Sequence, residues 1–163
     1  MDTYVAIASK RDERAYTDTP IPDDVVARIL DCGRLSGSSR NTQKWEFVVV
    51  SGDAQAQLAE LVYAPENVAT ATLVVAVVGE AFPLDAGRCV QNMMLGAWND
   101  GVVSCPNGVK EREAAAALLG GEVKAIISFG YPANKRDVAV RSAAEWSAKA
   151  NRKSLDELVR RVD

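Results

Sequence analysis

The residues best suited to ligand binding lie in one loop, with the sequence SGSSRNTQKW over positions 36–45. Two serines, Ser38 and Ser39, precede two amides, Asn41 and Gln43, and all four side chains can donate and accept hydrogen bonds. An apolar, β-branched run follows at once and predicts a buried strand over 45–51. A strand directly behind a polar loop holds the loop's hydrogen-bonding groups still, so we predict that this loop faces a ligand. The alternative is that Asn41 satisfies the backbone of its own loop.

Basic residues near both ends of the chain could bind a phosphate. The sequence contains neither G-x-G-x-x-G after a strand nor G-x-x-x-x-G-K-[ST], so arginine and lysine side chains would have to hold such a group. The candidates are Lys10, Arg11 and Arg14 near the start of the chain, and Arg152 and Lys153 near its end. For Arg11 and Arg14, the alternative is a set of surface ion pairs with Asp12 and Glu13.

The composition excludes several kinds of chemistry. The 163 residues include no histidine, which removes Ser-His-Asp and Cys-His arrangements and most zinc sites, and we predict no catalytic side chain and no metal site. Three widely spaced cysteines form neither a disulfide framework nor a metal pattern. We expect Cys105 to be an inert thiol.

A net charge of −3 argues against nucleic acid as a partner, and no apolar run is long enough for a membrane span. We therefore expect a cytoplasmic protein.

Hydrophobic periodicity predicts alternating helices and strands. Besides the strand over 45–51, we expect a central strand over 72–79, apolar on both faces, and a third over 122–131. Residues 102–109 are expected to form a turn-rich loop. Strands separated by helices indicate a single domain over 1–163 of the α/β or α+β class, with a mixed sheet. Helices are predicted over 3–10, with Thr3 as the N-cap, and over 23–35, with Asp23 as the N-cap. Further helices are predicted over 54–63, over 85–100, after the loop at 102–109 as far as residue 119, and over 155–162.

Four segments together resemble the FMN-dependent nitroreductase family. The segment KRDERAY at 10–16 is similar to the family's R-R-S-x-R-x-F opening, and SGSSRNTQKW resembles its A-P-S-x-x-N-x-Q-P-W loop. The segment DAGRCVQNMMLGAWNDG at 85–101 is similar to the central helix D-x-G-x-x-x-Q-N-x-x-L-x-A-x-x-x-G. IISFGYP at 126–132 resembles the last strand and its L-G-Y-P turn. Their order and spacing hold over nearly the whole chain. Asp12, Gly37 and Lys44 differ from the Ser, Pro and Pro usual in the family.

The resemblance implies an α+β fold, with a mixed sheet flanked by helices as an α/β/α sandwich. It also implies an FMN site at the interface of an intertwined homodimer. In that arrangement Lys10, Arg11, Arg14, Arg152 and Lys153 bind the phosphate and ribityl chain. The loop, with Ser38, Ser39, Asn41 and Gln43, lies against the flavin, often from the other subunit. A backbone N–H near Asn107 or Gly108 reaches flavin N5.

The resemblance also implies an activity. We expect an oxidoreductase that uses NAD(P)H to reduce a nitro, quinone or enone acceptor by a ping-pong flavin mechanism. In such an enzyme the cofactor carries the chemistry, which explains how a chain without histidine could be catalytic. Two alternatives remain: a flavin-binding module without fast turnover, and a family member that has lost FMN and acts as a dimeric interaction protein.

Overall fold

The computed structural model describes residues 1–134, 138 and 141–162, which fall into two compact units. One unit spans residues 11–135, and the other combines residues 1–10 with residues 136–163. Each unit is described by itself below. A single domain over 1–163 stays a prediction.

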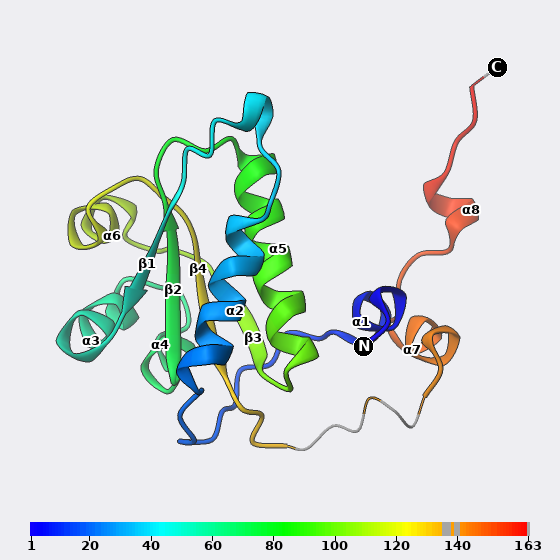
Figure 1. Cartoon of the computed structure of the whole chain (residues 1–163), viewed down its shortest axis with the longest axis horizontal. Helices are drawn as coiled ribbons and strands as arrows, with labels where there is room; N and C mark the ends of the chain where they lie inside the picture. Colours follow the sequence, from blue (N-terminus) through cyan, green and yellow to red (C-terminus); the bar gives the residue numbers. More distant parts are fainter. Residues whose placement is uncertain (135–137, 139–140, 163) are drawn as a thin grey trace. The chain divides into compact units, whose positions relative to one another are not determined.

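The larger unit is built on a four-stranded sheet with the order β1-β2-β4-β3 (Figure 1). The strands are β1 (Glu46–Val50), β2 (Leu73–Val78), β3 (Val103–Asn107) and β4 (Val123–Gly130). All three neighbouring pairs are antiparallel, with Val75 opposite both Val49 and Ile127. The α+β class is confirmed, but the expected mixed sheet is an antiparallel one. Its parallel element in the described residues is an isolated bridge between Asp12 and Ser104.

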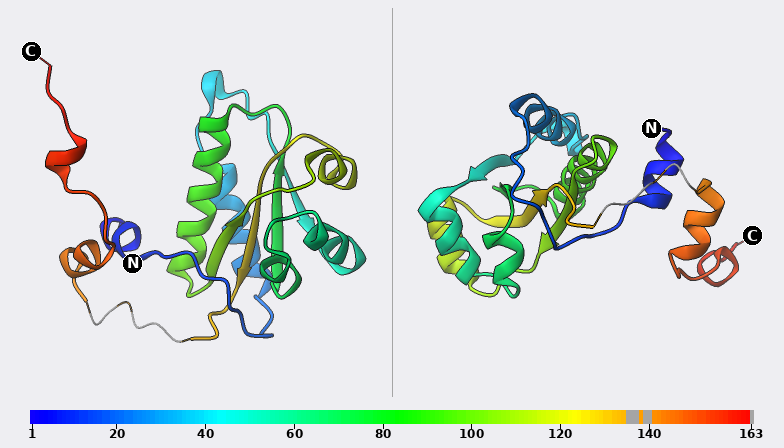
Figure 2. Two further views of the ribbon diagram at one scale, coloured as in Figure 1. Left: turned by 180° about the vertical axis from the view of Figure 1, so that it is seen from behind. Right: turned by 90° about the horizontal axis from the view of Figure 1, so that it is seen from below.

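Helices cover both faces of the sheet, as the views in Figures 1 and 2 show. Side chains alternate along β2, so Val74, Ala76 and Val78 point to one core while Leu73, Val75 and Val77 point to the other. This alternation explains why the strand is apolar throughout and buried along its length. The first face carries α3 (Gly52–Glu60), α4 (Pro65–Ala69) and α6 (Arg112–Leu119), and the second carries α2 (Asp23–Arg34) and α5 (Pro83–Asn99).

Two glycines let α2 and α5 approach each other closely. A Cβ atom on Gly33 would lie 2.9 Å from Met93 Cγ, and one on Gly96 would lie 2.6 Å from Cys32 Sγ. Both distances are shorter than real Cβ contacts, so side chains at these positions would push the helices apart. The helix pair therefore depends on glycine at both positions.

The second unit is small and leaves apolar side chains exposed. It contains α1 (Thr3–Ser9), α7 (Ala143–Lys149) and α8 (Leu155–Leu158). Trp146 is buried, and its indole N–H donates to the Val138 carbonyl at 3.1 Å. After α8, Val159 is extended, so the helix predicted to reach residue 162 ends four residues earlier. The exposed apolar residues of this tail are Leu155, Leu158, Val159 and Val162.

Three further expectations are corrected by the structure. The N-cap of α1 is Asp2, whose carboxylate accepts from the Tyr4 and Val5 amides, and not Thr3. The helix α2 begins at Asp23, but its N-cap is Pro22. The strand β1 lies at the edge of the sheet, and Val49 is 49% exposed where the sequence predicted a buried strand.

Residues 103–107 form strand β3, although residues 102–109 were expected to be a loop. Pro106 suggested a break because it cannot donate to a strand ladder, yet proline is tolerated on an edge strand such as β3.

None of the helices in the described part of the chain combines the length and apolar character needed to cross a bilayer.

Candidate functional site

The loop at 36–45 has a strained backbone that exposes its polar side chains. Arg40, Asn41 and Gln43 have φ of 54°, 56° and 49°, in the left-handed region that non-glycine residues rarely adopt. Ser38 Oγ accepts from the Gln43 amide at 2.9 Å, and the Gln43 carboxamide donates to the Asn41 carbonyl at 3.2 Å. Strain of this kind persists only where the surroundings hold it.

Gln43 and Asn41 have different roles in this loop. Gln43 is the amide that satisfies the loop's own backbone, which is the alternative considered for Asn41. The Asn41 side chain is exposed and has no hydrogen-bond partner among the described residues. Asn41 can therefore offer its whole carboxamide to a ligand, whereas Gln43 can offer only the part that the loop does not use.

Side chains of α5 hold the beginning of the loop. The Ser39 amide donates to Asp85 Oδ2 at 3.1 Å, and the Asn92 carboxamide donates to Ser36 Oγ at 2.8 Å. Asp85 is only 6% exposed, so its carboxylate depends on such partners. Neither Asp85 nor Asn92 was among the predicted site residues. Their spacing of seven, which places both on one face of a helix, was the available signal.

Residues 11–14, which we call the basic segment, begin the larger unit and run along the outer edge of β3. Asp12 forms the bridge to Ser104, and the Glu13 amide donates to the Ser104 carbonyl at 3.1 Å. Arg11 is half-buried and Arg14 is exposed. The structure thus brings the predicted phosphate-binding segment beside the strand that ends at Asn107.

Asn107 belongs to a buried polar network. Its carboxamide donates to the Cys105 carbonyl and to Ser128 Oγ, both at 3.1 Å, and its oxygen accepts from Asn67 at 3.2 Å. The Asn107 side chain is therefore committed to the fold. Gly108, by contrast, is exposed, and its carbonyl accepts from the Tyr63 amide at 3.0 Å. A ligand at this place would meet the backbone at Gly108 and not the Asn107 side chain.

Tyr16 joins the basic segment to this network. Its hydroxyl donates to the Glu13 carbonyl and lies 2.9 Å from Ser128 Oγ. Burial raises the pKa of Tyr16 to about 12, so the phenol stays protonated at neutral pH. A Cβ atom on Gly130 would lie 2.8 Å from this side chain, which explains the glycine before Tyr131 and Pro132.

The loop and the basic segment lie apart within the larger unit. The loop contacts Asp85 at the start of α5, whereas the basic segment lies beside the start of β3, which follows the end of α5 (Figure 1). The helix has 17 residues and is about 25 Å long. Lys10, Arg152 and Lys153 belong to the second unit, where Lys10 is half-buried and the other two are exposed.

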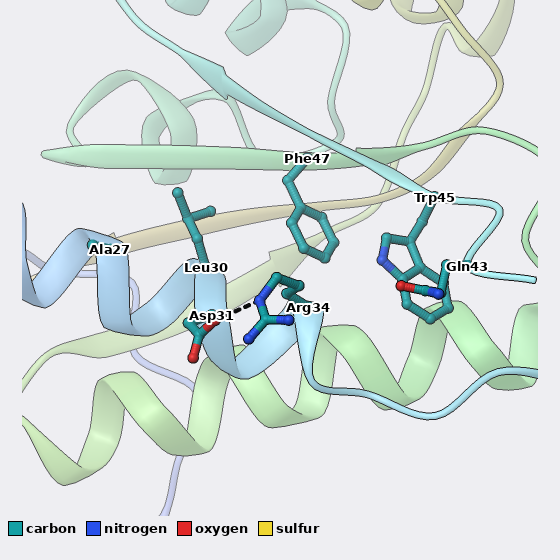
Figure 3. Close-up of a pocket in the computed structure, with 7 residues that line it drawn as sticks. All are labelled: Ala27, Leu30, Asp31, Arg34, Gln43, Trp45 and Phe47. Carbon is teal, nitrogen blue, oxygen red and sulfur yellow. Dashed lines mark hydrogen bonds and ion pairs between the residues drawn. The ribbon is translucent and has the colours of Figure 1, made fainter. Parts of the chain in front are cut away.

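A pocket of about 530 Å³ opens between α2 and the end of the loop (Figure 3). Ala27, Leu30 and the ion pair of Arg34 with Asp31, at 2.6 Å, form one side. Gln43, Trp45 and Phe47 form the other side. Gln43 is the predicted site residue that lines this pocket, and Trp45 packs partly into the core as expected.

Comparisons with known proteins bear on the family and the fold. Residues 7–82 match the model of the nitroreductase family. A protein of Archaeoglobus fulgidus assigned as an NADH dehydrogenase/NAD(P)H nitroreductase is 28% identical over 149 residues, covering 80% of this chain and 86% of that protein. A crystal structure of a protein from Desulfovibrio desulfuricans, assigned as a nitroreductase and in complex with FMN, superposes with a TM-score of 0.80 at 25% identity. That superposition covers 100% of this chain and 98% of the other. The chain resembles the nitroreductase family in sequence and shares its fold.

The family resemblance inferred from the four sequence segments is thus confirmed. A match to 4-nitrobenzoate reductase of Pseudomonas putida, 35% identical over 66 residues, covers 40% of this chain and 29% of that protein. In this chain the loop at 36–45 is held on the long helix α5, and the basic segment lies beside β3.

Proposed function

We propose that this protein is an FMN-dependent oxidoreductase of the nitroreductase family. It uses NAD(P)H to reduce a nitro, quinone or enone acceptor, and the two substrates use the site in turn in a ping-pong cycle. The observation that carries the proposal is the strained loop held on α5, with the unpartnered Asn41 carboxamide exposed. When bound, FMN supplies the electron-transfer chemistry. NAD(P)H as the electron donor would suit a cytoplasmic location.

The donor groups fit FMN by their chemistry. Arg11 and Arg14, with Lys10, Arg152 and Lys153, supply the cationic groups that bind a phosphate through charge-assisted hydrogen bonds. Ser38, Ser39, Asn41 and Gln43 supply hydroxyl and amide groups suited to the polar edge of a flavin ring. Gly108 is exposed and has no side chain of its own, and the Tyr63 ring lies 3.0 Å from the place a Cβ atom would take, so a ligand would approach this backbone from the side away from Tyr63.

Two features support a homodimer in which both subunits complete each site. The loop and the basic segment lie at opposite ends of α5, so one cofactor could use both more easily if they came from different copies. The tail at 155–162 exposes four large apolar side chains, which a second subunit would cover. The small-molecule acceptor would then bind at a site formed by residues of two chains.

The test is whether the protein retains flavin. Purified protein is incubated with FMN, desalted and examined by visible absorption, and then mixed with NADH or NADPH without oxygen. We expect retained flavin bands that bleach with one or both donors. Retained colour without bleaching would indicate a flavin-binding module. A folded, colourless protein would contradict the proposal and favour a member that has lost FMN, with Asp12→Ser as the first reversion to make.

The basic segment can be tested in the same assay. Arg11→Gln and Arg14→Gln should each weaken FMN binding about tenfold or more, since a hydrogen bond to a charged group contributes about 1.5–3 kcal/mol. Arg112→Gln removes an exposed arginine at the start of α6 and serves as the control. Equal FMN affinity in all three variants would remove the phosphate role from this segment.

A further inference from the structure

We propose that Arg88 is a positioning residue for the flavin-facing loop, and that Gly37 provides the space in which its guanidinium lies. The inference rests on the proposed FMN site, and it assigns a role to a residue outside the predicted set. It also explains why the loop carries glycine at position 37 where proline is usual in the family.

The guanidinium of Arg88 occupies the place of a side chain at position 37. A Cβ atom on Gly37 would lie 2.4 Å from one terminal nitrogen of Arg88, 3.2 Å from the other and 3.1 Å from Cζ. Real Cβ atoms do not approach other atoms so closely, so any larger residue at 37 excludes the guanidinium from this position. Gly37 therefore allows the loop to approach the Arg88 guanidinium closely.

Arg88 contacts the loop at Gly37, between the two loop residues that form hydrogen bonds with α5. Ser36, on one side of Gly37, accepts from Asn92, and Ser39, on the other side, donates to Asp85. Asp85, Arg88 and Asn92 follow the spacing i, i+3 and i+7, so they share one face of α5. We call these three residues the α5 anchor.

Arg88 also supports the buried carboxylate of this anchor. Asp85 Oδ1 lies 3.9 Å from an Arg88 nitrogen, while Oδ2 accepts from the Ser39 amide. The Asp85 side chain is 8% exposed and that of Arg88 is 50% exposed, so the pair joins a buried anion to a solvated cation. A buried carboxylate without a nearby cation would hold the loop less firmly.

The strained residues follow the anchored part of the loop. Arg40, Asn41 and Gln43 keep left-handed backbones only if the chain before them is fixed, and residues 36–39 are the part that the α5 anchor fixes. Loss of Arg88 would let this segment relax and would disperse the exposed Ser39 and Asn41 groups. The consequence is weaker FMN binding without a large change in the fold.

The test is a double-mutant cycle on Gly37 and Arg88. In Gly37→Ala the new methyl group displaces the guanidinium, which is the movable end of a flexible side chain. Gly37 has no positive φ, so alanine adds no backbone strain. Gly37→Ala and Arg88→Ala should therefore each weaken FMN binding about tenfold, and the double variant should be no weaker than either.

Two further readouts separate positioning from general damage. Amide hydrogen exchange of residues 36–44 in the FMN-free protein should quicken in both single variants, while exchange of β2 stays unchanged. Arg88→Lys should restore part of the affinity. Arg28→Ala is the matched control, because Arg28 binds Asp100 at the other end of α5 at 2.6 Å.

The outcomes decide between the two proposals. Wild-type protein that binds FMN, with both single variants binding as tightly, would overturn the role of Arg88 alone. Losses that multiply in the double variant would also overturn it, because the two residues would then act independently. Wild-type protein that retains no FMN would overturn the proposed function and this inference together.

Discussion

Tyr16 is the residue whose ionisation the fold controls most clearly. Its pKa is raised to about 12 by burial, against about 10 in an unfolded chain. Between these two values the unfolded state loses the phenolic proton while the folded state keeps it. The stabilisation is therefore complete below about pH 10 and is lost as the pH rises towards 12.

We expect Tyr16→Phe to lower the free energy of unfolding by about 1 kcal/mol at pH 8, since a buried hydrogen bond is lost. The difference from wild type should shrink at pH 11, because the wild type loses stability there and the variant has no phenol at this position. Urea unfolding at the two pH values measures both. Tyr4→Phe, at an exposed tyrosine, is the control. An equal difference at pH 8 and pH 11 would show that burial does not shift this phenol.

The sequence predicted the roles of some individual residues and not those of others. The exposed Asn41 carboxamide was expected because an amide in a loop of small residues can hardly be buried. The burial of the Asn107 side chain was not expected, since its partners Asn67 and Ser128 lie 40 and 21 positions away along the chain. At Gly37 the sequence shows only a difference from the proline usual in the family, and the position of Arg88 in space gives the reason for it.

At the scale of elements, α2 and α5 meet at Gly96 and Cys32, and we expect the effect of Gly96→Ala on stability to depend on the residue at position 32. Gly96→Ala should cost about 1–3 kcal/mol, because its Cβ atom meets Cys32 Sγ. In a Cys32→Ala background the sulfur is absent, and alanine is favoured over glycine within a helix by up to about 1 kcal/mol. The same substitution should then be neutral or stabilising.

Urea unfolding of the four proteins in this cycle measures the coupling between Gly96 and Cys32. Gly87→Ala is the matched control on α5, since no atom lies within 4 Å of its added Cβ, and it should stabilise the protein slightly. If Gly96→Ala costs the same in both backgrounds, the close contact between the helices does not limit their packing.

The elements themselves were predicted well wherever burial was uniform. The central strand β2 and the helices α2 and α5 follow from long apolar patterns, which depend on local sequence and one core. Strand β3 was missed because Pro106 and the Asn-Gly pair are turn signals, and the sequence does not say which strand lies at an edge. The burial of β1 was overestimated for the same reason, since sheet order decides how far Val49 is covered.

At the scale of the whole molecule, the exposed apolar tail is the feature that a single chain leaves unexplained. Leu155, Leu158, Val159 and Val162 are between 58% and 78% exposed, although each would gain roughly 1.5–3 kcal/mol from full burial. A single sequence cannot show which surface covers them, because the pattern of apolar residues does not distinguish the chain's own core from that of a second copy. We expect the partner subunit of the proposed homodimer to cover them.

The double substitution Leu158→Asp and Val162→Asp should therefore shift the protein from dimer to monomer, because it would place two charges in a buried interface. FMN retention should fall in parallel, since each proposed site needs groups from both subunits. Sedimentation velocity over a range of concentrations gives the first result, and absorption after desalting gives the second. Arg160→Gln removes a charge from the same tail without adding one to the interface, so it should change neither. A variant that remains dimeric and keeps its FMN would show that this tail does not hold the subunits together, and the dimer contact would then have to lie outside the tail.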